Sequence, residues 1–326
     1  MKLNFVMNQM TALRYFIPLV IEGNRRGITS NIFILPCGKY NCPGRFKEQL
    51  SELSEKYGFK TLPMEEVPNH SGLLFFIESA GLKNVICDNY RKVVLTYMIN
   101  YSLEYKRYID RVDHVIFPSE FMESAYEQPL LQKGKHLCLG SPKYDISFDV
   151  NTIYKKFKIR NPSVKKAFVI MPRTRDSSHI NFKLLYETLH ELGYEIITKT
   201  RGKDHYSEEY YGDYHFTDSC WYPHDSMDLI HISDLVINFG STAIKECVKL
   251  KTPIVNFDIK PFKDCLQIMC NHEYCENLNG KFTGEELKEA VRRLNSKSLD
   301  SEFNESIEKY LFSGNSSKRI LDFLSL

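Results

Sequence analysis

Short apolar runs alternate with amphipathic, helix-like segments along almost the whole chain. Apolar runs of about four to eight residues are typical of buried strands, and apolar positions about three or four residues apart are typical of helices. Strands are predicted at residues 2–7, 30–35, 84–87, 113–117, 166–171, 195–199, 235–239 and 253–257. Helices are predicted at residues 11–25, 45–57, 91–111, 181–192, 227–232, 243–249, 285–294, 301–310 and 317–324. This order predicts an α/β protein with parallel sheets.

A polar, basic stretch at residues 149–164 shows no clear periodicity and divides this alternation in two. At 326 residues the chain is long for one hydrophobic core and sufficient for two domains of ordinary size. We therefore expect a first domain over residues 1–150 and a second over residues 151–310. Residues 311–326 are expected to form a C-terminal helix that packs back on the first domain.

The amino-acid composition limits the classes of protein to which the chain can belong. Hydrophobic residues make up 43% and charged residues 26%, as in a folded globular protein. The net charge of +2 gives no overall attraction to nucleic acid, so a phosphate-binding surface has to be local. The nine cysteines follow no regular spacing, which indicates a reducing compartment, and we expect a cytoplasmic protein. No apolar run reaches the roughly 20 residues that span a bilayer, so any contact with the inner face of the membrane is expected to be peripheral.

The most informative segment is residues 234–257, which has the pattern strand, glycine turn, short helix, strand. Gly240 supplies a turn without a Cβ, and Ser241 or Thr242 is expected to cap the following helix. The first backbone N–H groups of that helix would then face the turn and favour an anion such as phosphate. Glu246 is expected on the polar face one turn later, where its carboxylate suits ribose hydroxyls. The alternative is an ordinary capped helix with a solvated glutamate.

Two basic clusters follow strands of the second half. Arg173 and Arg175 come after the strand at 166–171, and Lys199 and Arg201 come at the end of the next one. The carboxyl ends of parallel strands form the edge where open α/β sheets bind ligands, so we expect these cations around one diphosphate. The alternative is that both clusters are solvated loops.

Other polar and aromatic groups have two interpretations each. His224 precedes a helix and is a candidate phosphate or nucleobase ligand, while Asp225 or Ser226 would serve as an ordinary cap. Tyrosines recur at helical spacing within residues 91–111, which suits packing on a sheet or stacking on a sugar. They are Tyr97, Tyr101, Tyr105 and Tyr108.

Metal sites are not favoured by the sequence. Residues 265–275 contain Cys265, Cys270, His272 and Cys275, but this spacing matches neither paired C-x-x-C sites nor a zinc finger. The dinucleotide, P-loop, zincin and nucleophile-elbow motifs are missing from the sequence, as is an Asp-x-Asp pair that would hold a metal-bound diphosphate. We expect no metal and no cofactor, so helix dipole and cations would have to neutralise a leaving group.

Four stretches carry a family resemblance. They are residues 26–28, residues 113–121 together with 140–145, residues 233–257, and residues 314–321. They resemble two-domain glycosyltransferases of the GT-B fold, in particular the branch that contains CDP-glycerol glycerophosphotransferases and capsule-type sugar transferases. The resemblance implies two Rossmann-like domains facing across a cleft, with residues 1–150 as the acceptor domain and 151–310 as the nucleotide-donor domain.

The resemblance also implies roles for individual residues. Ser241 and Thr242 would lie at the phosphates of the donor, and Glu246 at its ribose. The chain lacks the His-Pro pair that the glycerophosphotransferase branch tends to show near the position of Lys199, and it has Thr96-Tyr-Met where His-Gly is usual. Both departures weigh against glycerol phosphate transfer and leave the catalytic base unassigned. His70, Glu78 and Asp88 lie near predicted strand ends and are candidates for it.

These features together predict a glycosyltransferase that moves a sugar from a nucleotide-diphosphate donor of UDP or CDP type to a hydroxyl of a surface glycan. The acceptor would be a glycan or a lipid-linked acceptor, and chemistry would occur between the two halves. Three alternatives remain: a CDP-glycerol-type polyol-phosphate transferase, a nucleotide-sugar epimerase, and a non-catalytic carbohydrate-binding protein of the same fold.

Overall fold

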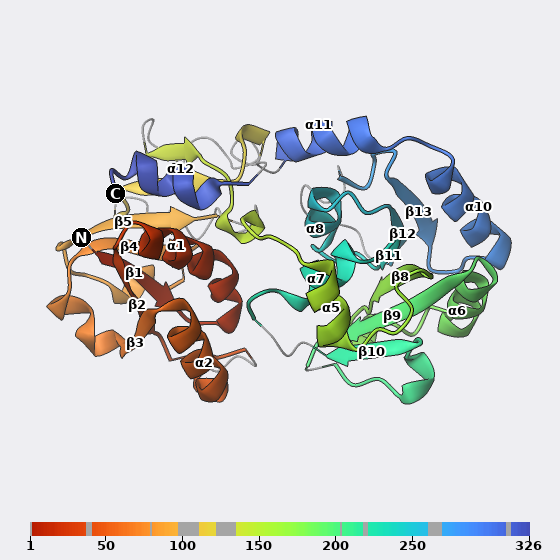
Figure 1. Cartoon of the computed structure of the whole chain (residues 1–326), viewed down its shortest axis with the longest axis horizontal. Coiled ribbons are helices and arrows are strands. Elements are labelled where there is room, and N and C mark those ends of the chain that lie inside the picture. The colour runs from red at the N-terminus through yellow and green to blue at the C-terminus, as the bar shows by residue number, and fades with distance from the viewer. Residues whose placement is uncertain are drawn as a thin grey trace. The chain divides into compact units, whose positions relative to one another are not determined.

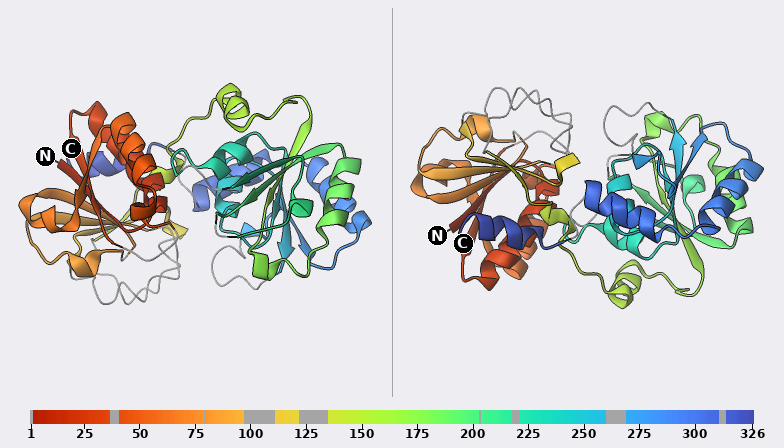
Figure 2. Two further views of the ribbon diagram at one scale, coloured as in Figure 1. Left: turned by 90° about the horizontal axis from the view of Figure 1, so that it is seen from below. Right: turned by 90° about the horizontal axis from the view of Figure 1, so that it is seen from above.

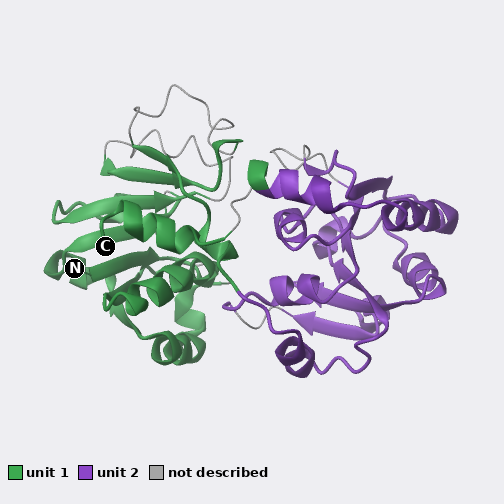
Figure 3. Ribbon diagram, turned by 45° about the horizontal axis from the view of Figure 1, so that its top comes forward, with its two compact units in different colours: residues 1–146, 308–326 green, residues 147–307 purple. Residues whose placement is uncertain are grey.

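The computed structural model describes residues 2–36, 41–78, 80–96, 111–121, 135–202, 204–217, 221–259, 269–310 and 314–326. The chain divides into two compact units (Figure 3). Unit 1 contains residues 1–146 and 308–326, and unit 2 contains residues 147–307. Each unit is built on its own parallel sheet.

Unit 1 has a seven-stranded parallel sheet in the order β3-β2-β1-β4-β5-β6-β7 (Figure 1). Its strands are β1 (Lys2–Met7), β2 (Thr29–Ile34), β3 (Phe59–Pro63), β4 (Gly72–Ile77), β5 (Tyr90–Leu95), β6 (His114–Phe117) and β7 (His136–Cys138). Its helices include α1 (Leu13–Arg25), α2 (Lys47–Tyr57) and α12 (Ser316–Phe323). The core is apolar, and the ring of Phe5 stacks on Phe75 of the neighbouring strand β4 at 5.2 Å. The strand order reverses between β1 and β4, which in open α/β sheets marks a ligand-binding crevice.

Unit 2 has a six-stranded parallel sheet in the order β10-β9-β8-β11-β12-β13, the strand order of a Rossmann fold. Its strands are β8 (Lys165–Ile170), β9 (Tyr194–Thr200), β10 (Tyr214–Thr217), β11 (Leu235–Asn238), β12 (Ile254–Asp258) and β13 (Cys275–Asn279). Its helices include α5 (Val150–Phe157), α6 (Phe182–Glu191), α7 (Asp225–His231), α8 (Ile244–Lys249), α10 (Gly284–Asn295) and most of α11 (Asp300–Tyr310). Helix α6 packs with α10, and α7 packs with α8, on the two faces of this sheet (Figure 2).

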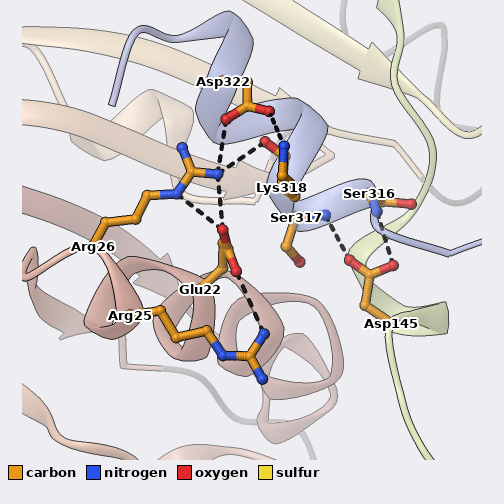
Figure 4. A network of polar contacts seen from close by, with 8 residues as sticks. All are labelled: Glu22, Arg25, Arg26, Asp145, Ser316, Ser317, Lys318 and Asp322. Atoms are coloured by element: carbon orange, nitrogen blue, oxygen red, sulfur yellow. Dashed lines mark hydrogen bonds and ion pairs between the residues drawn. The ribbon is translucent and has the colours of Figure 1, made fainter.

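The C-terminal helix α12 lies against α1 within unit 1 (Figure 4). Asp145 accepts hydrogen bonds from the backbone N–H groups of Ser316 (2.9 Å) and Ser317 (2.5 Å), the first two residues of α12. On the other side, Arg26 forms ion pairs with Glu22 at 2.8 Å and with Asp322 at 2.9 Å. The last residues of the chain are therefore held by residues that are far away in the sequence.

Two predicted segments are wrong. The strand predicted at 84–87 overlaps a short turn of 3-10 helix, and the strand is Tyr90–Leu95, which was predicted as the start of a long helix. A central parallel strand is buried on both faces and shows an apolar run rather than alternation, so its periodicity resembles that of a buried helix. Residues 97–110 of the predicted helix, including the four tyrosines, lie outside the described residues.

The predicted irregular stretch at 149–164 is also different in the structure. It contains helix α5, whose N-terminal N–H group on Asn151 is capped by the carboxylate of Asp149 at 3.1 Å. Only Ile153 and Phe157 of this helix are buried, so the apolar repeat is too short to be seen in the sequence. Within the residues that the structure describes, no helix has both the length and the apolar character needed to span a membrane.

Candidate functional site

The carboxyl edge of the second sheet carries most of the predicted donor-binding residues. Strands β8 and β11 are neighbours, with Val169 opposite Ile237, although β9 and β10 intervene in the sequence. Arg173 follows β8 and the turn at Gly240 follows β11, so both lie beyond the carboxyl ends of neighbouring parallel strands. Because the strand order reverses here, the edge between β8 and β11 is the expected ligand crevice.

The turn after β11 is formed at Gly240, as predicted. Gly240 has a φ of 65°, a left-handed conformation that a residue with a Cβ adopts at a cost. Its N–H donates to the Asn256 side-chain oxygen at 3.4 Å, and the N–H of Ser241 donates to the side-chain oxygen of Asn238 at 3.2 Å. The sequence predicted that the backbone N–H groups at this turn are free to bind an anion. For Gly240 and Ser241 this prediction is wrong, because both N–H groups donate to asparagine side chains. Thr242 is an exposed residue, and no residue that the structure describes accepts a hydrogen bond from its N–H.

The predicted cap of the following helix is only partly correct. Helix α8 begins at Ile244, and its N-cap residue Ala243 has no side-chain cap. The hydroxyl of Ser241 instead accepts a hydrogen bond from the N–H of Ala243 at 3.3 Å. Because α8 has only six residues, its dipole adds little to anion binding.

Glu246 was predicted to face solvent or ligand. The prediction of a solvent-facing side chain is wrong, because Glu246 is buried. Glu246 is 4% exposed and its neighbour Lys245 is 8% exposed. Residues 244–248 of α8 are all buried, and the helix packs against α7. A helix covered in this way buries polar residues that the sequence pattern assigns to its outer face.

The four predicted cations have different surroundings. Arg173 and Arg175 are exposed after β8, and Arg175 lies 3.6 Å from the carboxylate of Asp176. Lys199 is buried within β9, opposite Ile170 of β8. Arg201 is half-buried directly after β9. Of the four, Arg173 combines exposure with a position after β8, the strand next to β11.

His224 lies directly before α7 and is buried. The first turn of α7 is fixed by Lys156 of α5, whose Nζ lies 2.8 Å from Asp225 and 2.7 Å from Asp228. Burial would lower the pKa of Lys156, but the two carboxylates raise it above its ordinary value. Burial and the negative charge of Asp225 raise the pKa of Asp228 above its ordinary value, although Lys156 acts to lower it. Since α7 and α8 pack together and begin at the same edge, His224 lies on the same side of the sheet as the turn.

A pocket of about 410 Å³ opens at the ends of β12 and β13 and was not predicted from the sequence. It is lined by His179, Asp258, Ile259, Asn279, Gly280 and Lys281. Asp258 stands opposite Asn279 at the ends of β12 and β13, and β12 pairs with β11, the strand that leads into the turn at Gly240. The pocket therefore lies at the carboxyl edge of the sheet, on the strands next to β11. No local sequence motif predicts this pocket, because its lining residues come from three separate segments of the chain.

The three candidates for a catalytic base lie at opposite edges of the first sheet. Glu78 follows β4 at the carboxyl edge, beside β1 where the strand order reverses. It is buried, has a φ of 51°, and its N–H donates to the carbonyl of Leu95 at 3.0 Å. His70 precedes β4 and Asp88 precedes β5, so both lie at the amino edge. The structure therefore does not bring His70 and Asp88 together with Glu78.

The cysteine and histidine residues near position 270 have protein partners. His272 lies 2.6 Å from the carboxylate of Glu302, and its ring stacks on Tyr274 at 5.2 Å. Within the described ranges, no group of three or more His, Cys, Asp or Glu side chains is arranged to hold a metal ion. Cys265 lies outside those ranges.

Comparison with solved structures gives the fold class. The chain is similar to the glycotransferase of kitacinnamycin, with a TM-score of 0.66 and 10% identity over 100% of this chain and 99% of that one. It is similar to the wall teichoic acid polymerase TagF, with a TM-score of 0.66 and 13% identity over 99% of this chain and 88% of that one. It is also similar to UDP-GlcNAc 2-epimerase from Neisseria meningitidis, with a TM-score of 0.61 and 13% identity over 100% of both chains.

The fold is thus the GT-B fold, as predicted, with two Rossmann-like α/β units. No protein-family model matches the chain, and no curated protein matches it by sequence. The arrangement of the two units around a cleft stays a prediction.

Proposed function

We propose that the protein is a glycosyltransferase in which unit 2 binds a nucleotide-diphosphate sugar and unit 1 binds the hydroxyl acceptor. The observation that carries the proposal is the switch point of the second sheet, where Arg173 after β8 and the turn at Gly240 after β11 follow two neighbouring parallel strands. A guanidinium, a backbone N–H group and two hydroxyls within this edge are suitable donors to phosphate oxygens.

The diphosphate would lie along this edge. The phosphate next to the sugar contacts the Thr242 N–H, the hydroxyls of Ser241 and Thr242, and the guanidinium of Arg173. The other phosphate and the nucleoside extend toward His224. Arg175, Lys199 and Arg201 add positive charge that stabilises the departing nucleoside diphosphate. A contact between Glu246 and the ribose stays a prediction.

The group that is transferred would occupy the pocket beside the turn. Asp258, which lines this pocket, ends β12, and β12 is the neighbour of the strand that leads into the turn at Gly240. Asp258, Asn279 and Lys281 offer both acceptors and donors for sugar hydroxyls. The likeness to a glycotransferase and to an epimerase bound to UDP-GlcNAc supports a nucleotide-sugar donor.

Transfer itself requires a base for the acceptor hydroxyl. We propose Glu78, because it is the candidate at the carboxyl edge of the first sheet. The acceptor O–H gives its proton to the Glu78 carboxylate while its oxygen forms a bond to the sugar carbon. The bond from this carbon to the phosphate oxygen breaks, and its electron pair leaves with the nucleoside diphosphate, whose charge the cations neutralise.

A nucleotide-binding screen tests the proposal. Thermal shift with UDP, CDP, GDP and CMP should show stabilisation by one diphosphate, since a ligand at 100 times its Kd adds about 2.7 kcal/mol to the free energy of unfolding. Donor trials with nucleotide sugars should then release that diphosphate only when a glycan acceptor is present, whereas turnover of CDP-glycerol would release CMP. The absence of binding by any diphosphate would contradict the proposal.

The second candidate is a nucleotide-sugar epimerase. It is favoured by the full-length likeness to UDP-GlcNAc 2-epimerase, which covers 100% of both chains. An epimerase would turn over the donor without any acceptor, whereas CDP-glycerol turnover would indicate a polyol-phosphate transferase. A non-catalytic binding protein would be indicated if variants of Lys199, Arg201, Thr242 and Glu246 all bound nucleotide like the parent.

A further inference from the structure

Three asparagines stand in register on neighbouring strands of the second sheet. Asn238 of β11 is opposite Asn256 of β12, which is opposite Asn277 of β13. Asn238 and Asn256 are fully buried, and Asn277 lies at the exposed end of the row. We call these three residues the asparagine ladder. The inner strands of a parallel sheet usually carry apolar residues, so amides in this position need a reason.

The side chains of the ladder form one directed chain of hydrogen bonds. Asn238 Nδ2 donates to Asn256 Oδ1 at 2.9 Å, and Asn256 Nδ2 donates to Asn277 Oδ1 at 3.1 Å. Asn277 Nδ2 then donates to the carbonyl of Cys270 at 2.7 Å. Each amide therefore has its orientation fixed by the next one.

The ladder also holds the glycine turn. Asn256 Oδ1 accepts a second hydrogen bond from the N–H of Gly240, and Asn238 Oδ1 accepts the N–H of Ser241. These two N–H groups are thereby directed toward the sheet, while the N–H of Thr242 has no acceptor among the described residues. An apolar side chain at position 256 would fill the same space but would leave the N–H of Gly240 without its acceptor.

We infer that the asparagine ladder is a positioning device for the diphosphate of the donor. It fixes the backbone of Gly240 and Ser241, so that the N–H of Thr242 and the two hydroxyls of the turn face the phosphate next to the transferred group. None of the three asparagines touches the ligand. This inference rests on the proposed function. It states that the asparagine ladder makes the site prefer a nucleoside diphosphate to the corresponding monophosphate.

The test compares two ligands in the Asn256→Ala variant of the full chain. The probes are the diphosphate among UDP, CDP and GDP that binds the parent most tightly, and the corresponding monophosphate. We expect the Kd of the diphosphate to rise about 10-fold and that of the monophosphate to change less than about 3-fold, because misplaced donors weaken the phosphate contact alone. Hydrogen exchange of residues 238–244 should become faster in this variant.

The first sheet offers a matched control. Asn31 Nδ2 donates to Asn4 Oδ1 at 3.0 Å, and these two buried asparagines also stand opposite each other on neighbouring parallel strands. Asn31→Ala should lower the unfolding temperature in the same way as Asn256→Ala. It should leave the ratio of the two dissociation constants unchanged, since it lies in the other unit.

A second variant keeps the test decisive if Asn256→Ala does not fold. Asn277→Ala removes the exposed end of the ladder and should shift the Kd ratio in the same direction by a smaller factor, about 3-fold. An unchanged ratio in the folded ladder variants would overturn the inference and leave the proposed function intact. Failure of the parent to bind any diphosphate would instead remove the proposed function, and the positioning role with it.

Discussion

Arg173 and Lys199 belong to similar basic clusters in the sequence, yet their side chains have different surroundings. Arg173 is exposed in the loop after β8, while Lys199 is buried within β9. A charge in a loop is free to meet a phosphate, whereas a buried charge is held by the protein around it. The position of a cation relative to the end of its strand therefore decides its role more than the cluster does.

We predict that Arg173→Ala weakens binding of the best nucleoside diphosphate about 10-fold, because a charge-assisted contact to phosphate contributes about 1.5 kcal/mol or more. Isothermal titration measures this change. The control is Lys165→Ala, at the amino end of the same strand, which should bind like the parent. Equal Kd values for the parent and the Arg173 variant would exclude Arg173 from the site.

Glu78 gives a prediction about chemistry. Glu78→Gln keeps the shape of the side chain and removes its ability to accept a proton, so kcat should fall at least about 100-fold while the donor Kd stays the same. Asp88→Asn is the contrast, because Asp88 lies at the opposite edge of the same sheet and should retain full kcat. A Glu78→Gln enzyme with normal kcat would move the search for the base to residues elsewhere.

At the scale of elements, the sequence was informative where burial is one-sided. Helix α10 has one apolar stripe and a capping box at Thr283 and Glu286, and it was predicted at 285–294 and found at Gly284–Asn295. Strand β10 was not predicted, because its residues are only partly buried. This edge strand is held in the sheet by its pairing with β9. The residues of β10 alone do not predict that pairing.

Edge strand β10 gives a pH prediction. His215 stacks on Tyr211 at 3.5 Å and contacts Thr198 at 3.2 Å, and burial lowers its pKa below the ordinary 6.5. A depressed pKa means that the folded state prefers the neutral ring. This contribution to stability is complete above pH 6.5 and is lost as the pH falls through the lowered pKa.

The measurement is the urea midpoint of unfolding between pH 7 and pH 5. His215→Phe keeps a stacked ring and cannot be protonated, so its midpoint should fall less over this range than that of the parent. Burial also lowers the pKa values of His114 and His231, so part of the acid sensitivity will persist. Identical pH profiles for the parent and the variant would show that His215 does not contribute.

At the scale of the whole molecule, the chain returns to its first unit at the end. Residues 308–326 belong to unit 1, and the first N–H groups of α12 are capped by Asp145 rather than by a local residue. Asp145→Ala should lower the free energy of unfolding of unit 1 by about 1 kcal/mol, as loss of a helix cap does. Asp145→Asn keeps one of the two acceptors and should lower it less.

Chemical denaturation followed separately for the two units would measure this effect. Nucleotide binding should be unchanged in both Asp145 variants, since the proposed donor site lies in unit 2. A loss of nucleotide affinity in Asp145→Ala, with unchanged stability, would contradict a purely structural role of this cap.

The sequence by itself determined the α/β class, most strands and helices, and the glycine turn at Gly240, because these depend on residues close together in the chain. Only the tertiary structure decided that Glu246 and Lys199 are buried, that Glu78 lies at one edge of the sheet and Asp88 at the other, and that the asparagines of β11, β12 and β13 bond in a row. The physical reason is that burial and hydrogen bonding depend on neighbours contributed by distant segments. Strand order and register bring these neighbours together, and neither can be read from a local pattern.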